Sequence, residues 1–264
     1  MAHMSYSRNN IRTTQPTVFP GTLFRIAHKE SIKDEDTNPT TGENEGSSTC
    51  VSRKNRQTYI ILKRGFDIVV SLIVVCTLLL LLYIILGLFI KLTSRGPVFF
   101  KQQRNGLNGK IFTILKFRTM ITNAEADTRQ ATSLDERTTK VGRFLRKTSL
   151  DEIPQFWNVL MGDMSLVGPR PHMIHDNEYY ESRIQGYARR VTVKPGITGL
   201  AQVMGYRGET RQEIEMVHRL RLDLWYIEHR SLMLDIYIVF YTGLEFLGFK
   251  KPHHSTLSES SPKE

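Results

Sequence analysis

An uncharged apolar run limits what this chain can fold into more than any other feature of its sequence. From Ile68 to Ile90 the chain reads IVVSLIVVCTLLLLLYIILGLFI, without one charged side chain. A helix of this length, at about 1.5 Å per residue, is about 34 Å long, which is enough to cross the hydrocarbon core of a bilayer. The run begins deep in the chain and lacks a small-residue cleavage site, so it is a poor signal peptide. It predicts a membrane-inserted helix.

The charges that flank this run bear on its topology. Lys63 and Arg64 precede it, and Lys91 and Arg95 follow it. The positive-inside rule usually gives a spanning helix one basic flank and one bare flank. Basic residues on both sides therefore favour a re-entrant helix that enters and leaves on the same side, and a spanning helix is the alternative. We expect re-entry, and with it a monotopic protein.

The overall charge indicates an anionic partner. The chain of 264 residues contains 36 Lys and Arg against 26 Asp and Glu, a formal charge of +10. Such a balance favours nucleic acid, a phosphorylated substrate or an anionic membrane surface, without choosing among them. Cys50 and Cys76 provide neither a disulfide framework nor zinc-ligand spacing, which is typical of a reducing compartment.

The composition divides the chain into four segments. Residues 1–57 form a polar tail that has too little apolar surface to order itself. Residues 58–95 are the membrane helix with its basic flanks, residues 96–249 form the main domain, and residues 250–264 are a second polar tail. We expect a mainly α fold with a small β-hairpin, in which amphipathic helices associate with the membrane.

The β-hairpin is predicted directly after the membrane segment. The runs VFFKQQ and KIFTILKF have high strand propensity and flank RNGLNG, whose two Asn-Gly pairs indicate a turn. If the second strand continues, Lys116 and Arg118 project from the same face, because side chains alternate along a strand. Two exposed cations and a phosphate-binding pair both fit this placement.

Helices are predicted for the remainder of the chain. The stretch from Thr138 to Met164 is typical of two short helices with a break near Thr148. Residues 211–230 are typical of a charged amphipathic helix. The apolar residues of this charged helix recur at three- and four-residue steps, at Ile214, Val217, Leu220, Leu224 and Ile227. Residues 231–249 predict a helix that lies on the membrane or packs beneath the domain.

An adjacent acidic pair, Asp151 and Glu152, lies between basic and apolar residues. Ser149 and Glu152 fit the capping-box pattern, which is the purely structural interpretation. That interpretation places Pro154 in the second turn, where its ring clashes with the backbone, whereas a helix start at Asp151 tolerates the proline. A second acidic pair, Asp135 and Glu136, lies in a polar run and is more typical of a solvated turn.

Carboxylates in this setting have two kinds of chemistry available. They can hold Mg²⁺ against a diphosphate, or one of them can attack phosphorus as a nucleophile. Attack on phosphorus requires cations around the phosphoryl oxygens. Arg143, Arg146 and Lys147 lie upstream, and Arg170 lies between two prolines that restrict its backbone. His172 and His175 have no companion ligand and are expected on the surface or in packing.

Four segments of this chain together resemble a known family. KRGFD, GPVFFKQQRNGLNGKIFTILKFRTM, TKVGRFLRKTSLDEIPQFWNVLMGDMSLVGPRP and VKPGITGLAQVMGYRGET are similar to motifs of the bacterial sugar transferases, the monotopic phosphoglycosyl transferases. The resemblance extends from about Lys63 to Phe249. Within the family it is nearest to the branch that transfers glucose-1-phosphate or galactose-1-phosphate in exopolysaccharide and capsule pathways.

The resemblance implies an activity and its partners. Such enzymes transfer a sugar-1-phosphate from a UDP-sugar to undecaprenyl phosphate and release UMP, by a ping-pong mechanism with Mg²⁺. The catalytic domain is expected on the cytoplasmic face of the bacterial inner membrane, with a homodimer left open and no nucleic acid bound. The alternative function is a membrane-tethered basic scaffold for anionic lipid or nucleic acid.

The resemblance also implies roles for particular residues. Asp151 is the expected nucleophile, and Glu152 its partner in metal binding or proton handling. The resemblance also implies residues that contact the substrates. Arg146, Arg170, Lys116 and Arg118 are expected at the phosphates, and Gln202 and Asp223 at the nucleotide side. Lys63 and Arg64 are expected at the polyprenyl phosphate. One departure concerns topology, because family members break the membrane helix with Ser-Pro where this chain has Leu79 and Leu80. The absence of proline favours a straight span.

Overall fold

The computed structural model describes residues 48–121, 135–208, 210 and 212–248. The predicted tail 250–264 and residues 1–47 of the predicted tail 1–57 lie outside this description. Helix α2 (Ser48–Val74) begins inside the segment that was predicted as tail. The remaining elements form a mostly helical domain with small β-sheets, as the sequence indicated.

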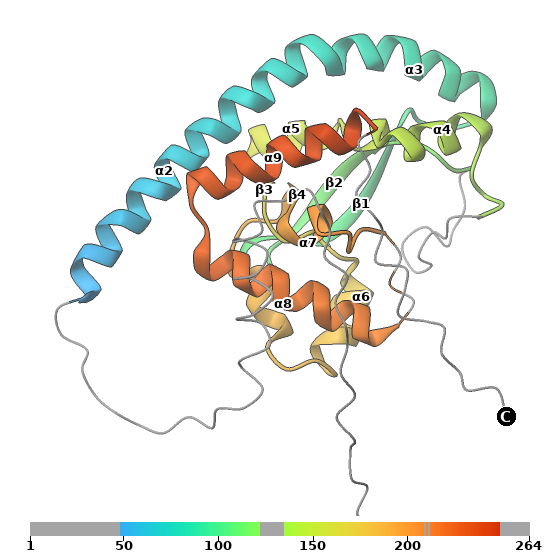
Figure 1. The fold of residues 1–264 in the computed structure, drawn as a ribbon. Coiled ribbons are helices and arrows are strands. Elements are labelled where there is room, and N and C mark those ends of the chain that lie inside the picture. The colour runs from blue at the N-terminus through green and yellow to red at the C-terminus, as the bar shows by residue number, and fades with distance from the viewer. Residues whose placement is uncertain (1–47, 122–134, 209, 211, 249–264) are drawn as a thin grey trace, which may run out of the picture. The chain divides into compact units, whose positions relative to one another are not determined.

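The apolar run folds into one continuous helix. Helix α2 passes through a π-helical segment, Val75–Leu79, directly into α3 (Leu80–Thr93), and Figure 1 shows the two as one curved ribbon. Among the described residues, Arg56–Thr93 is the one helix long and apolar enough to cross a membrane, and only 11% of its most apolar window is buried. The π-helical segment ends at Leu79, one of the two positions at which the resemblance implied a Ser-Pro break, and such segments are a common cause of helix bending.

The predicted β-hairpin is confirmed. Strands β1 (Phe99–Asn105) and β2 (Ile111–Phe117) pair antiparallel, with Phe99 opposite Phe117 and Asn105 opposite Ile111. Asn108 adopts a left-handed conformation with φ of 54° in the turn, which asparagine tolerates better than most residues. Strand β2 ends at Phe117, one residue before Arg118.

The break near Thr148 is also confirmed. Helix α4 (Lys140–Thr148) is followed by a 3₁₀ turn (Leu150–Glu152) and by α5 (Gln155–Met161), which starts directly after Pro154. Ser149 makes no side-chain cap for the 3₁₀ turn. The capping-box interpretation is therefore wrong, because a left-handed Ser149 reverses the chain where a helix start was considered.

The second half contains a parallel strand pair that the sequence did not reveal. Strand β3 (Ser165–Val167) pairs with β4 (Gly196–Thr198), and α6 (Ile174–Glu181) and a 3₁₀ segment (Tyr187–Thr192) lie between them in the chain. Three-residue strands are too short to show an alternating pattern. The chain continues through α7 (Leu200–Val203), α8 (Glu213–His229), which matches the predicted charged helix, and α9 (Leu232–Phe246).

Apolar packing joins the membrane helix to the domain. One core contains Val75 and Leu79 of the π-helical segment, Leu86 and Ile90 of α3, Phe117 of β2, Leu145 of α4, and Ile153 directly after the 3₁₀ turn. Figure 1 shows α5, α9 and α4 running beneath the arc of α2 and α3, and residues of α2 contact both α5 and α9. A second core, formed by Ile184, Tyr187, Met216 and Leu220, lies around α8.

Candidate active site

A cavity of about 1010 Å³ has the acidic pair on its wall. It is lined by the end of α3, the hairpin, the connection between α4 and α5, the Arg170–Met173 loop and the start of α8. Asp151 and Glu152 are each 8% exposed, so both carboxylates are nearly withdrawn from solvent. The volume lies at the upper end of the range for ligand pockets, enough for more than one small ligand.

The backbone between α4 and α5 turns the acidic pair toward this cavity. Ser149 has a φ of 55°, and its amide donates to the carbonyls of Leu145 and Arg146, which ends α4. The 3₁₀ turn that carries Asp151 and Glu152 follows at once, and Pro154 opens α5 in a position where its missing N–H costs nothing. Both carboxylates therefore sit on a tight reversal held by a helix on each side.

Glu152 is surrounded by cations. Its carboxylate accepts from Lys116 Nζ at 2.9 Å and from both terminal nitrogens of Arg170, one of them at 3.3 Å. Arg207 lies 3.7 Å away. Burial acts to raise the pKa of Glu152, but Arg170 and Lys116 outweigh it and hold the pKa well below its ordinary value. Glu152 is therefore ionised across the physiological range.

Asp151 is buried to the same extent and has a different environment. Within the described residues no hydrogen bond or ion pair joins its carboxylate to another side chain or to the backbone. Burial raises its pKa to about 6, against the opposing effect of Lys116. Asp151 thus presents to the cavity a carboxylate that is mostly ionised at neutral pH and has no partner among the described residues.

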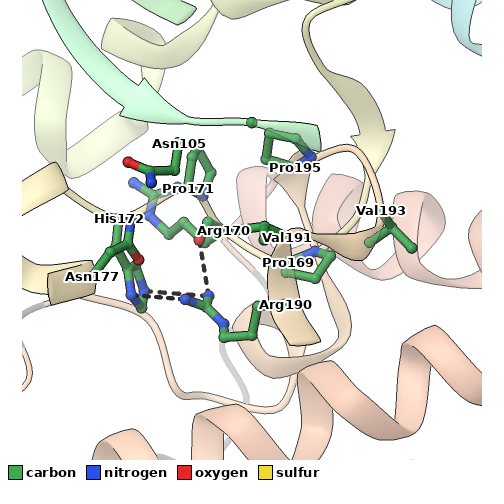
Figure 2. A pocket seen from close by; sticks show the side chains of 11 residues that line it. Asn105, Pro169, Arg170, Pro171, His172, Asn177, Arg190, Val191, Val193 and Pro195 are labelled. Carbon is green, nitrogen blue, oxygen red and sulfur yellow. Dashed lines mark hydrogen bonds between the residues drawn. The ribbon is translucent and has the colours of Figure 1, made fainter. Parts of the chain in front are cut away.

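Arg170 is held in place through its backbone. Its carbonyl accepts from Arg190 Nη2 at 2.9 Å, and Figure 2 shows this bond together with those from Arg190 to His172. The amide of Gly168 donates to Thr198 at 3.0 Å, and a Cβ on Gly168 would come within 2.5 Å of the Lys194 carbonyl. Glycine is required here by a close approach of two backbones, which fixes the loop that presents Arg170.

Arg146 completes the basic wall. Its Nε donates to Thr119 Oγ1 at 3.0 Å, and its pKa is lowered by burial while Asp151 opposes that effect. Four of the residues expected at phosphates or in catalysis therefore gather beside Asp151: Lys116, Arg146, Glu152 and Arg170. Of the other acidic pair, Asp135 binds Arg137 with both carboxylate oxygens, at 2.9 and 2.6 Å, within a turn.

The profile of the bacterial sugar transferase family matches residues 58–248, which include the whole cavity and the membrane helix. This chain belongs to the bacterial sugar transferase family. The family resemblance in the motifs is thereby confirmed.

Characterised and uncharacterised relatives share this region. The chain is 51% identical over 192 residues to a UDP-glucose:undecaprenyl-phosphate glucose-1-phosphate transferase of Klebsiella pneumoniae, covering 72% of this chain and 40% of that protein. It is 43% identical over 202 residues to the uncharacterized sugar transferase EpsL of Bacillus subtilis, covering 75% and 94%. It is 43% identical over 189 residues to an Aeromonas hydrophila transferase of N-acetylgalactosamine phosphate to undecaprenyl phosphate, covering 70% and 43%. The match thus spans about 40% of the Klebsiella relative's length.

Three cations expected at phosphates, Lys63, Arg64 and Arg118, bind other parts of the chain, although Arg118 also lines the cavity. The Arg118 guanidinium donates to the carbonyls of Arg95 at 2.7 Å and Ser94 at 2.8 Å, so it satisfies the end of α3. Lys63 bonds Asp235 at 2.8 Å, and Arg64 bonds the carbonyls of Val159 at 2.6 Å and Leu160 at 3.0 Å. In this arrangement Lys63, Arg64 and Arg118 fasten the membrane helix to the domain.

The two residues expected at the nucleotide side do not line the cavity. Gln202 is buried in α7, where its amide nitrogen donates to the Ile197 carbonyl at 3.3 Å. Asp223 is 2% exposed and accepts from Arg190 Nε at 2.8 Å. Asp223 therefore supports the arginine that holds the Arg170 carbonyl, at one remove from the cavity.

Other polar residues line the cavity: Arg104, Arg207 and Arg219 had no role in the sequence interpretation, and His172, expected on the surface or in packing, is buried at the cavity wall. Arg104, His172, Arg207 and Arg219 come from β1, the Arg170–Met173 loop, the α7–α8 connection and α8. No spacing joins residues so far apart in the chain. One signal could have indicated that Arg104 lines the cavity: it shares a strand face with Gln102, two residues away.

The carboxylates suit a magnesium ion that shares its ligands with a substrate. Among the described residues no group of three or more His, Cys, Asp and Glu side chains could hold a metal alone. Mg²⁺ is commonly held by one or two carboxylates plus substrate phosphates, and the open Asp151 fits that mode. Glu152 fits it less directly, because Lys116 and Arg170 already bind its oxygens.

Proposed function

We propose that this protein transfers a sugar-1-phosphate from a UDP-sugar to undecaprenyl phosphate and releases UMP, as the first membrane step of exopolysaccharide or capsule synthesis. The observation that carries the proposal is the contrast within the acidic pair. Asp151 is buried, open to the cavity and not hydrogen-bonded to any described residue, while its neighbour Glu152 is bound on both oxygens by cations. An unpartnered carboxylate beside fixed cations is suited to nucleophilic attack on a phosphoryl group.

In the first proposed step, a carboxylate oxygen of Asp151 attacks the phosphorus that bears the sugar. A bond forms between this oxygen and phosphorus, and the bond from phosphorus to the bridging oxygen breaks. UMP leaves with the bridging oxygen and its electron pair, and the sugar-1-phosphate is left on Asp151. In the second step, an oxygen of undecaprenyl phosphate attacks the same phosphorus and Asp151 departs as a carboxylate.

The basic wall has a distinct part in both steps. Arg146, Arg170 and Lys116 neutralise the phosphoryl oxygens, as positioned cations do in other phosphoryl transfers. Glu152 keeps Lys116 and Arg170 in place, because its depressed pKa maintains the charge that binds them. Mg²⁺, held by Asp151 and Glu152 with the diphosphate, supplies further charge neutralisation when it is bound.

The membrane placement is part of this proposal. The basic residues Lys63 and Arg64 near one end of the apolar helix and the carbonyls of Ser94 and Arg95 at the other are all bonded to the same domain. A helix held to one domain at both ends favours re-entry over a straight span, with the domain on the cytoplasmic face. Labelling tests this: in a background with Cys50 and Cys76 changed to Ser, single cysteines at Gln57 and Lys140 are both protected from an impermeant maleimide in spheroplasts. Labelling at Gln57 alone would indicate a straight span.

The function is tested by UMP release. The full chain, in nanodiscs with undecaprenyl phosphate and Mg²⁺, is given UDP-glucose, UDP-galactose, UDP-N-acetylglucosamine and UDP-N-acetylgalactosamine. We expect UMP from one of these donors, with UDP-glucose tried first because of the relatives' names. A folded preparation that releases UMP from none of them would contradict the proposal and favour the scaffold alternative.

A further inference from the structure

The cavity has two chemically different ends, which we distinguish by the residues that line them. One end is apolar: Tyr83 of α3 stacks on Phe99 at 5.3 Å between ring centroids, and Phe99 stacks on Phe117 at 5.4 Å. This end belongs to the membrane helix and the strand residues packed on it. The other end is polar and is lined by Gln102, Arg104, His172, Met173, Asp176, Gly208 and Arg219.

One face of the hairpin leads from the lysine beside the acidic pair to the polar end. Phe100, Gln102 and Arg104 alternate along β1, all line the cavity, and Phe100 lies opposite Lys116, the lysine that binds Glu152. From Phe100 to Arg104 the strand advances about 13 Å, at roughly 3.3 Å per residue. The polar end is thus separated from the reacting groups by a distance comparable with that between the phosphates and the base of a nucleotide.

Arg219 adds a buried positive charge to the polar end, which Asp223 offsets only in part. It is 5% exposed, and no carboxylate of the described residues lies within ion-pair distance of it. Its Nη2 donates to the Gly208 carbonyl at 3.1 Å, whereas its buried Nε has no partner in the part of the chain that is described. Burial and the nearby Arg190 lower its pKa to about 10, and Asp223 opposes them.

The groups around Arg219 are suited to a nucleotide. His172 is buried and its pKa is held well below its ordinary value by burial and by Arg190 and Arg219, so its ring is neutral and accepts hydrogen bonds. Arg104 presents a second planar guanidinium, bonded to the Pro171 carbonyl at 3.3 Å. Guanidinium groups bind phosphate and hydroxyl oxygens in pairs and stack on flat rings.

From these observations we infer that the Gln102–Arg104–Arg219 end of the cavity binds the nucleoside monophosphate part of the donor, with Arg104 and Arg219 as its main contacts. The inference rests on the proposed function and identifies where the donor lies. It replaces Gln202 and Asp223, which the sequence indicated for the nucleotide side. The apolar end is then left for the lipid acceptor.

A binding experiment with UMP tests this site. UMP and Mg²⁺ are titrated calorimetrically into the full chain in nanodiscs, with the wild type, Arg104→Ala, Arg219→Lys and the control Arg189→Ala. Arg189 is exposed, pairs with Glu228 and lies outside the cavity. We expect the first two variants to weaken UMP binding at least about tenfold, as loss of a charged hydrogen bond does, while the control and the KM for undecaprenyl phosphate change less than about twofold. Unchanged UMP binding in both variants would overturn the inference.

A second measurement needs no variant and so does not depend on folding. Wild-type protein is irradiated with 5-azido-UMP, and the labelled peptides are identified by mass spectrometry. Labels on Gln102–Arg104 or His172–Met173 support the site, and labels confined to Tyr83 or Gln202 overturn it. Labelling at this end without UMP release from any UDP-sugar refutes the proposed function and leaves the nucleotide site standing. Turnover together with labels only at other residues supports the proposed function and refutes the nucleotide site.

Discussion

Two buried carboxylates of this protein, Asp235 and Asp151, have opposite surroundings. Asp235 in α9 is fully buried and accepts hydrogen bonds from Tyr59 at 2.9 Å, Lys63 at 2.8 Å and Tyr226 at 2.6 Å. Asp151 is 8% exposed, faces a large cavity and accepts none from the described residues. Both are acidic residues near cations, and only the three-dimensional structure distinguishes the carboxylate that anchors a helix from the one that is open to the cavity and that we propose as the nucleophile.

The largest expected effect tests the open carboxylate. Asp151→Asn should lower turnover by at least about a thousandfold, as removal of other enzymic nucleophiles does, because an amide does not attack phosphorus. The variant should remain folded, since ionisation of the buried Asp151 carries a cost that the amide avoids. UMP release and thermal unfolding are measured together. Near-normal turnover in this variant would show that Asp151 is not the nucleophile.

The next effect concerns the cations that hold Glu152. Arg170→Lys keeps the charge and loses the paired hydrogen bonds, so kcat should fall roughly 10- to 100-fold. Arg183→Lys is the matched control, because Arg183 lies over the exposed Tyr179 ring and outside the cavity. Equal rates for the two variants would mean that Arg170 acts only as a charge.

A smaller effect is expected from pH. Burial raises the pKa of Asp151 to about 6, and the proposed reaction needs the ionised form. The value of kcat/KM for the donor should therefore be constant above about pH 7 and fall about tenfold per unit below pH 6. The same shift implies that the protonated form is favoured on folding, so this group stabilises the fold at low pH and the contribution is lost as pH rises through 6. A rate that stays constant down to pH 4.5 would exclude a carboxylate of this pKa.

The smallest expected effect on turnover comes from a change at Asp235, the anchoring carboxylate. Asp235→Ala leaves Lys63 without its acidic partner, and breaking such a buried pair costs about 3 kcal/mol or more of folding free energy. Activity per folded molecule should change less than about twofold, because Asp235 does not line the cavity. Denaturation curves measure the loss of folding free energy, and the rate of UMP release, corrected for the folded fraction, measures the change in activity. A large loss of activity without loss of stability would mean that the anchoring cluster takes part in the reaction.

The sequence predicted those features that depend on local patterns. The apolar run, the Asn-Gly hairpin and the break near Thr148 are each determined by neighbouring residues, and all three are present. The motifs around Asp151 and Arg170 also led to a family that the comparison confirms. Strands β3 and β4 were missed because three residues carry no readable period.

The sequence could not assign the charged residues to their contacts. Lys63, Arg64 and Arg118 resemble phosphate ligands by their position, yet each bonds to a carbonyl or carboxylate of this chain. Arg104 and Arg219 line the cavity although more than a hundred residues separate them. Tertiary packing decides whether a cation binds an acceptor of this chain or faces the cavity. The spacing of residues in the sequence does not reveal this packing.

The most direct test of the central claim is a reaction without acceptor. The full chain is incubated with Mg²⁺ and the UDP-sugar that supports turnover, in nanodiscs free of undecaprenyl phosphate, and digested for mass spectrometry. The account predicts one equivalent of UMP and the mass of a sugar phosphate on the peptide that carries Asp151, both absent in Asp151→Asn. UMP formation that requires undecaprenyl phosphate, with no modified peptide, would contradict it and indicate direct transfer between the two substrates.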